Sequence, residues 1–170
     1  MTEGKPARES ASEYCELALP NDANGLGNVL GGKVMHLVDL AGAMAAMRHA
    51  RRAVVTASVD SLHFLHPVRI GQLLILRSSV NRVFRTSMEV GVKVFAENLL
   101  TGETVHTCSA YLTFVALDAN GKVTPVAPVI PETEQEQRWY REAAERREYR
   151  LAMRNRRKYE AGLRRLGPQG

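Results

Sequence analysis

The sequence is poor in cysteine and in aromatic residues, and it contains no long hydrophobic run. Its 170 residues include two cysteines, Cys15 and Cys108, and one tryptophan. Two cysteines are too few for the disulfide scaffold of a small secreted domain, so we expect a reducing compartment. No apolar stretch approaches the roughly 20 residues of a membrane-spanning helix, and the first residues are too polar for a secretory leader. These absences predict a cytoplasmic protein without a membrane span.

The charge of the chain is positive and unevenly placed. The formal net charge is +5, from 23 Lys and Arg against 18 Asp and Glu, and most of the excess lies in residues 132–170. Glutamates alternate with arginines there, a pattern typical of a solvated helix with paired charges. The interspersed glutamates and the lack of a helix-turn-helix pattern argue against a nucleic-acid partner. We expect a helical C-terminal extension that packs in an oligomer or contacts a partner.

The apolar pattern predicts an α+β fold in three segments. Residues 1–11 are small and polar and are expected to be disordered, residues 12–131 form one domain, and residues 132–170 form the charged helical extension. The domain is expected to hold a helix over 33–48 and strands over 12–19, 53–60, 72–83, 88–98 and 103–117. A curved antiparallel sheet can bury such a helix by wrapping around it.

The predicted helix is apolar on nearly all sides. The stripe expected to face the chain's own sheet comprises Val34, Leu37, Val38, Ala41, Met44 and Ala45. The opposite side carries Met35, Ala43, Ala46 and Met47, with His36 and Asp39 as its polar groups. A helix that is apolar all round is buried on both sides, so a second subunit is expected to cover the second side.

Asp39 is a candidate functional residue because a carboxylate on an apolar helix face is costly unless it is paired, hydrogen-bonded or reached by water. Pairing with His36, one turn earlier, or capping of a neighbouring loop is an equally good explanation from the residues alone. Gly31 and Gly32 precede this helix and are either simple turn residues or the place where backbone N–H groups receive an oxyanion. An oxyanion site with a nearby carboxylate would make a workable hydrolytic pair.

A series of short motifs runs in order through residues 14–130. The motifs are Asp-Ala-Asn at 22–24, Gly-Asn-Val at 27–29, Gly-Gly at 31–32, Val-Asp-Leu-Ala-Gly at 38–42, Val-Thr-Ala-Ser-Val-Asp at 55–60, Phe-Leu-His-Pro at 64–67, Val-Arg-Ile-Gly at 68–71, Ser-Met-Glu-Val at 87–90 and Thr-Phe-Val-Ala-Leu at 113–117. This series resembles the hotdog-fold acyl-CoA thioester hydrolases of the cytosolic branch. The resemblance implies a hotdog fold and hydrolysis of acyl-CoA to free fatty acid and coenzyme A, with no cofactor or metal.

The resemblance also implies roles for individual residues. Asp39 would be the general base or the nucleophile, Asn24 would position water or the carbonyl, and the N–H of Gly32 would donate to the oxyanion. Contacts with the substrate are implied at Gly31, Thr56, Ser58, Arg82, Arg85 and Ser87, although a solvated hairpin is the alternative for the two arginines. Asn24 and Asp39 would meet across a subunit interface. The smallest active unit would then be a homodimer, and a trimer of dimers the expected assembly.

Other functions fit the residues less well. A non-catalytic hotdog acyl-CoA sensor, with the basic tail contacting a partner, would need neither Asn24 nor Asp39. A hotdog dehydratase uses an Asp/His pair, and His36 is a poor match because it shares a helix with Asp39. His63 and His66 lack the glutamate of a zinc-protease helix, and no serine lies in a Gly-x-Ser-x-Gly context. We therefore predict an acyl-CoA thioesterase.

Overall fold

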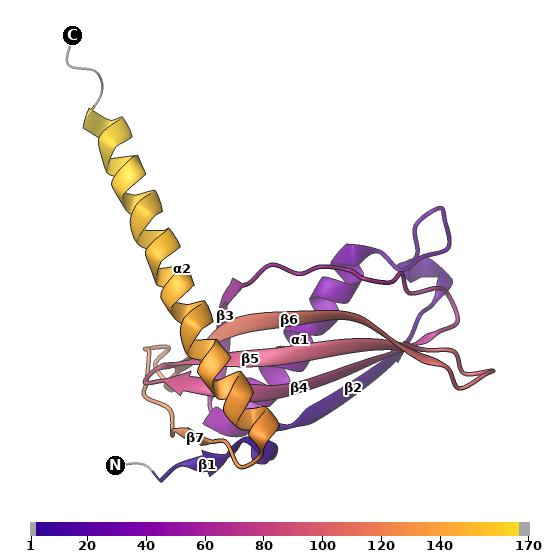
Figure 1. The fold of residues 1–170 in the computed structure, drawn as a ribbon, viewed down its shortest axis with the longest axis horizontal. Coiled ribbons are helices and arrows are strands. Elements are labelled where there is room, and N and C mark those ends of the chain that lie inside the picture. Colours follow the sequence, from indigo (N-terminus) through magenta and orange to yellow (C-terminus); the bar gives the residue numbers. More distant parts are fainter. Residues whose placement is uncertain (1–2, 167–170) are drawn as a thin grey trace.

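The computed structural model describes residues 3–166 and places a long helix beside a curved antiparallel sheet (Figure 1). The elements in chain order are β1 (Lys5–Pro6), η1 (Ala7–Ser10), β2 (Ser12–Leu17), η2 (Pro20–Asp22), α1 (Gly31–Ala50), β3 (Ala53–Val59), β4 (Leu73–Phe84), β5 (Ser87–Glu97), β6 (Thr104–Leu117), β7 (Val129–Ile130) and α2 (Glu134–Leu166). Each predicted strand and both predicted helices are present.

The main sheet has five strands in the order β2-β4-β5-β6-β3, and every neighbouring pair is antiparallel. Helix α1 lies against one face of this sheet and α2 crosses the other face (Figure 1). In β4 to β6, buried positions alternate with less buried ones, as expected for strands with one face on a core. The predicted α+β hotdog arrangement, one long helix wrapped by a curved sheet and followed by a C-terminal helix, is confirmed.

Helix α1 is longer than predicted at both ends. It begins at Gly31 and continues to Ala50, where Arg51 adopts a positive φ of 52° and its N–H donates to the carbonyl of Met47 at 2.8 Å. This left-handed residue ends the helix without a glycine. Near the middle, a Cβ on Gly42 would lie 2.9 Å from the ring of Phe114. Gly42 therefore allows α1 to approach the sheet closely.

The two sides of α1 differ partly from the prediction. The expected core stripe is confirmed, because Val34, Leu37, Val38, Ala41 and Ala45 are buried and Met44 packs against them. On the opposite side, Met35 and Met47 remain 48% and 44% exposed. Ala46 on that side is fully buried within the single chain, so the expectation that a second subunit covers it is wrong. Segment η1 also contacts α1 and adds to the part of the helix surface that the chain itself covers.

Residues 3–11 are ordered, whereas the sequence predicts disorder over residues 1–11, of which residues 1–2 lie outside the described part of the chain. Strand β1 pairs in parallel with β7, and the η1 turn follows it directly. The hydroxyl of Ser10 is buried, donates to the carbonyl of Ala7 at 2.7 Å and accepts the N–H of Val80 at 2.8 Å. The Ser10 side chain thus takes the place of a backbone partner for Val80 beyond the end of β2, which composition alone does not reveal.

The C-terminal helix α2 combines a docked part with a projecting part. Its first half lies on the outer face of the sheet, where Ala143 is fully buried, and its later turns extend away from the domain (Figure 1). The extension was predicted as an arm for oligomer or partner contacts, but its first half packs on the chain's own sheet. Across residues 3–166, no helix is long and apolar enough to cross a membrane.

Candidate active site

Asp39 lies half-buried in the middle of α1 and is hydrogen-bonded to the edge strand of the sheet. The hydroxyl of Thr56 in β3 donates to Oδ1 of Asp39 at 2.6 Å. No hydrogen bond or ion pair joins His36 to Asp39 within the described chain, so the structure favours Thr56 over the His36 pairing that the residues left open. A carboxylate with one oxygen held by a hydroxyl keeps its other oxygen available for water or substrate.

The strand that carries Thr56 is irregular at this point. The pairing of β3 with β6 shifts register between Thr56 and Ser58, which indicates a β-bulge. Bulges change the direction of side chains along a strand, and here Thr56 faces Asp39. Ser58 lies just beyond the bulge and is half-buried. Thr56 and Ser58, the two substrate contacts predicted on β3, therefore lie on the same short stretch. Only Thr56 is hydrogen-bonded to Asp39.

The start of α1 presents backbone N–H groups. The N–H groups of Lys33 and Val34 both donate to the carbonyl of Leu30, at 3.0 and 3.2 Å. No hydrogen bond among residues 3–166 satisfies the N–H of Gly31 or of Gly32, and both glycines are exposed. A Cβ on Gly32 would meet no atom within 4 Å. The helix start is therefore an open site for a negatively charged oxygen.

Two ion pairs hold this helix start in place. Nζ of Lys33 lies 2.5 Å from a carboxylate oxygen of Glu16 and 3.3 Å from one of Asp22. The hydrogen bond from Lys33 lowers the pKa of Glu16 below its usual value, and the same bond raises the pKa of Lys33. Lys33 and Glu16 were not selected from the sequence. The sequence shows only a lysine directly after the glycine pair. It does not reveal that Lys33 pairs with Glu16 on β2 and with Asp22 before the helix.

Asn24 organises the loop that leads to α1. Its side-chain Oδ1 accepts the N–H groups of Leu26 and Asn28, at 2.9 and 3.2 Å, and its carbonyl accepts the N–H of Gly27 at 3.0 Å. The side-chain NH₂ group remains as a donor on an exposed residue. Within the described part of one chain, no hydrogen bond joins Asn24 to Asp39. The described part of a single chain thus shows no bond between these two predicted residues.

The remaining predicted contacts lie at the β4–β5 hairpin. Arg82 packs over the ring of Tyr140 in α2, with its guanidinium carbon 4.1 Å from the ring centre, and donates to the carbonyl of Tyr140 at 3.2 Å. Arg85 is exposed at the tip with a positive φ of 57°. Ser87 pairs with Val115, which in turn pairs with Val55 of β3. The hairpin tip is thus two strands from β3, with Arg85 exposed and Arg82 engaged by α2.

The sequence and the architecture are similar to those of known proteins. The sequence model of the thioesterase superfamily matches residues 26–103. A protein of Bacillus subtilis (strain 168), named uncharacterized acyl-CoA thioester hydrolase YkhA, is 45% identical over 129 residues, which are 76% of this chain and 75% of that protein. The chain belongs to the thioesterase superfamily.

Solved structures are similar to this thioesterase-family chain over almost its full length. A hexameric acyl-CoA thioesterase is 44% identical, with a TM-score of 0.87 over 89% of this chain and 97% of that one. An acyl-CoA hydrolase of Staphylococcus aureus, solved with butyryl coenzyme A and coenzyme A, is 35% identical, with a TM-score of 0.86 over 94% of this chain and 97% of that one. Alanine variants of the same hydrolase were solved at an asparagine, an aspartate and a threonine. Those positions have the same spacing along its chain as Asn24, Asp39 and Thr56 have here.

Proposed function

We propose that this protein is an acyl-CoA thioesterase, which converts acyl-CoA and water to a free fatty acid and coenzyme A. The observations that carry the proposal are the carboxylate of Asp39, held by Thr56 at 2.6 Å, and the two free N–H groups at the start of α1. A base or nucleophile and an oxyanion site are the two elements that thioester hydrolysis needs. The relatives named acyl-CoA hydrolase or thioesterase support this substrate class.

Asp39 acts in one of two ways in this proposal. As general base it takes a proton from water, and the resulting hydroxide attacks the thioester carbon. As nucleophile it attacks that carbon itself and forms an anhydride, which water then hydrolyses. In both routes the carbon–sulfur bond breaks, coenzyme A leaves as a thiolate that takes up a proton, and the second oxygen of the acid comes from water. Thr56 fixes the orientation of the carboxylate for either route.

The N–H of Gly32 donates to the thioester oxygen as negative charge develops on it. This role is supported by the unsatisfied N–H, by the open space at Gly32 and by the positive end of the α1 dipole. Gly31 has a different environment, because a Cβ there would lie 3.4 Å from the ring of Phe64. In the proposed complex the pantetheine arm passes between Gly31 and the Thr56–Ser58 stretch of β3.

The coenzyme A phosphates are proposed to lie near the β4–β5 hairpin. Arg85 is exposed there and Ser87 is half-buried beside it, so both can contribute to a phosphate contact. Arg82 was included in the same contact from the sequence, and its stacking on Tyr140 gives it a second, structural role. The phosphate contact therefore depends mainly on Arg85 in this proposal.

The catalytic unit is proposed to be a homodimer, assembled further into a trimer of dimers. The outer edge of β3 has no partner strand among the described residues, and Val55 and Val59 on it are exposed, as are Met35 and Met47 on α1. An open edge strand beside an exposed apolar helix face is a surface that a second copy can cover. The hexameric state of a solved relative supports the larger assembly.

Thiol release from acyl-CoA substrates of increasing chain length tests the activity directly. The unmodified protein should hydrolyse at least one of them, and Asp39→Asn should lower turnover by about 100-fold or more while the fold is kept. Asp118→Asn is the matched control, because Asp118 accepts two turn N–H groups that an amide oxygen can also accept. Acyl-CoA binding without thiol release would contradict the proposal and favour the non-catalytic sensor. Near-normal turnover of Asp39→Asn would remove Asp39 from the mechanism.

A further inference from the structure

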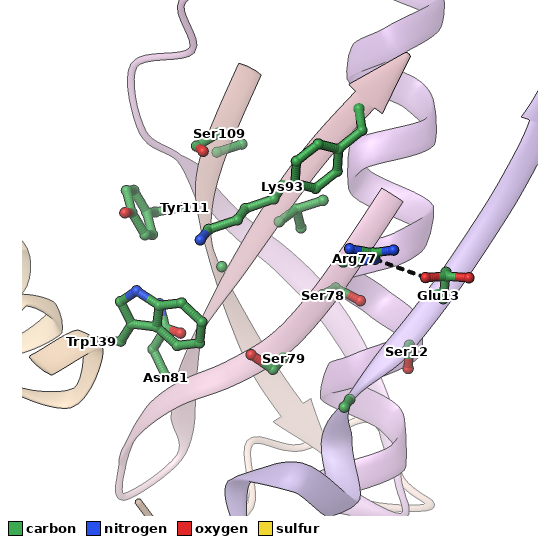
Figure 2. A pocket seen from close by; sticks show the side chains of 15 residues that line it. Ser12, Glu13, Arg77, Ser78, Ser79, Asn81, Lys93, Ser109, Tyr111 and Trp139 are labelled. Carbon is green, nitrogen blue, oxygen red and sulfur yellow. Dashed lines mark hydrogen bonds and ion pairs between the residues drawn. The ribbon is translucent and has the colours of Figure 1, made fainter. Parts of the chain in front are cut away.

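A second concave site lies on the outer face of the sheet, opposite α1 and beside the start of the docked half of α2 (Figure 2). Its volume is about 490 Å³, within the range of small-molecule sites. Side chains from four strands and from α2 surround it, including Glu13, Arg77, Lys93, Phe95, Tyr111 and Trp139. We call this site the outer trough. Its residues are separate from Asp39, Thr56 and the start of α1.

The floor of the outer trough is low because small residues meet across the strands. Ser79 of β4 pairs with Gly91 of β5, and Gly91 pairs with Tyr111 of β6. A Cβ on Gly91 would lie 3.0 Å from the side chain of Asn81, so glycine keeps this part of the floor open. One row further along, Ser109 pairs with Lys93. The trough is thus formed where small side chains on the middle strands lie between larger side chains.

The walls of the trough are aromatic. Trp139 of α2, Tyr111 of β6 and Phe95 of β5 surround it, in a chain with one Trp, five Tyr and four Phe. All three are half-buried, and they present apolar ring surface to the hollow. Such walls favour a ligand with an apolar body.

Two cations lie in the same cross-strand row. Arg77 and Lys93 are direct neighbours on β4 and β5, and Figure 2 shows the amine of Lys93 pointing toward Tyr111 and Trp139. The amine lies 4.9 Å from the ring centre of Trp139, and no carboxylate pairs with it within residues 3–166. Arg77 uses its Nε to bind Glu13 at 2.8 Å, which leaves its terminal nitrogens without a hydrogen bond in the described chain. Two cations and one carboxylate give the trough an excess of positive charge that matches a monoanion.

We propose that the outer trough binds a small amphipathic carboxylate, of the class of a medium-chain fatty acid. The apolar chain lies on the small-residue floor against Trp139, Tyr111 and Phe95, and the carboxylate contacts Lys93, while Arg77 adds positive charge to the trough (Figure 2). This binding is separate from hydrolysis, because none of these residues belongs to the proposed catalytic site. Glu13 limits the affinity, because its negative charge offsets the positive charge of Arg77.

The single tryptophan of the sequence makes the proposal directly measurable, because the indole fluorescence comes from Trp139 alone. The full chain is titrated with decanoate below its micelle-forming concentration, and calorimetry repeats the measurement. Decanoate should change the fluorescence saturably, and Lys93→Gln should weaken binding by about tenfold, because a charged hydrogen bond is lost. Lys122→Gln, in the exposed turn after β6, is the matched control and should bind like the unmodified protein. Hydrolysis rates of both variants should be unchanged.

Three comparisons decide between the proposal and its alternatives. Glu13→Gln should bind decanoate more tightly, because it removes the negative charge that offsets Arg77, whereas a general loss of structure would weaken binding. Decanol should bind less tightly than decanoate, and equal affinity would overturn the role of the two cations. Inorganic phosphate should not compete, and competition at similar concentrations would show a simple anion site.

Absence of saturable binding by both methods, or equal affinity of Lys93→Gln and the unmodified protein, would also overturn the proposal. Thiol release measures the hydrolytic function separately, so either idea can fail alone.

Discussion

Thr56 has a different environment from the other residues that the resemblance assigned to substrate binding. Its hydroxyl is 2.6 Å from the carboxylate of Asp39, and a β-bulge follows it directly. A donor that holds one carboxylate oxygen keeps the other in a defined direction. Sequence reasoning could place Thr56 near the substrate, but it could not show this bond because the two residues belong to different elements.

Replacing Thr56 with Val should therefore affect turnover more than substrate capture. Valine keeps the shape of the side chain and removes the hydroxyl, so we expect kcat to fall by about tenfold with a small change in KM. Thr56→Ser retains the donor and should stay close to the unmodified enzyme. Steady-state kinetics with one acyl-CoA substrate measures both variants. Equal activity of the Val and Ser variants would show that the hydrogen bond has no role in turnover.

His49 makes the stability of the fold depend on pH. It is fully buried near the end of α1, and its Nε2 lies 2.8 Å from the carbonyl oxygen of Ala127. Burial lowers the pKa of His49 below its ordinary value of 6.5, and the bond to Ala127 opposes this shift only in part. Below pH 6.5 His49 therefore binds a proton in the unfolded chain, whereas in the folded chain it does so only at a lower pH. The folded state loses stability as the pH falls through 6.5 toward the folded pKa.

Urea unfolding of the unmodified protein and of His49→Gln tests this dependence. The amide of glutamine can still donate to Ala127 but does not titrate. As the pH falls from 7 to 5, the unmodified protein should lose stability relative to His49→Gln, by at most about 1.4 kcal/mol per pH unit. A constant difference over this range would mean that His49 titrates alike in the folded and unfolded states.

At the scale of elements, the strands and α1 were predictable because their local patterns are strong. The stripe from Val34 to Ala45 has helical spacing and is buried as expected. The boundaries of the elements were less predictable. Helix α1 ends at Ala50, because the next residue, Arg51, adopts the left-handed conformation without being glycine. The order of the N-terminal segment depends on Ser10 bonding to Val80, a contact between distant parts of the sequence. Composition does not contain that information.

The sequence also does not reveal that α2 packs on the sheet, because the main contact of α2 is a buried carboxylate on a strand. Glu89 of β5 is fully buried and accepts hydrogen bonds from Arg146 Nη2 at 2.7 Å and from Arg150 Nη1 at 3.2 Å. Asn81 donates to the same carboxylate at 3.2 Å, and Arg150 also binds Asp60 at 2.8 Å. The alternating charges of the extension predicted a helix, but they did not show that two of its arginines bind the sheet.

Glu89→Gln should destabilise the protein strongly. The change leaves Arg146 without its buried counter-charge and leaves Arg150 with Asp60 alone, and breaking a buried pair costs roughly 3–5 kcal/mol. Glu142→Gln is the matched control, because Glu142 is 40% exposed and its nearest contact with Arg146 is 3.7 Å. Its effect should be below about 1 kcal/mol. Urea denaturation at a fixed protein concentration compares the two, and equal losses would contradict the importance of the buried cluster.

At the scale of the whole molecule, the proposed active site depends on a second copy of the chain. Asn24 and Asp39 do not contact each other within the described chain, while Met35 and Met47 on α1 and the edge of β3 are uncovered. The sequence could predict the residue types of the site through its motifs. The meeting of Asn24 with Asp39 stays a prediction, because it depends on a second copy whose placement no local pattern determines.

Mixing two damaged chains tests the shared site most directly. Asn24→Ala and Asp39→Asn chains are each prepared as inactive parents, combined in equal amounts and allowed to exchange subunits. In a two-fold dimer each mixed pair contains one intact site and one doubly damaged site. Because half of the dimers are mixed, thiol release should recover to roughly a quarter of the unmodified activity. Exchange confirmed by mass spectrometry without any recovery of thiol release would contradict the shared site, as would a fully active monomer.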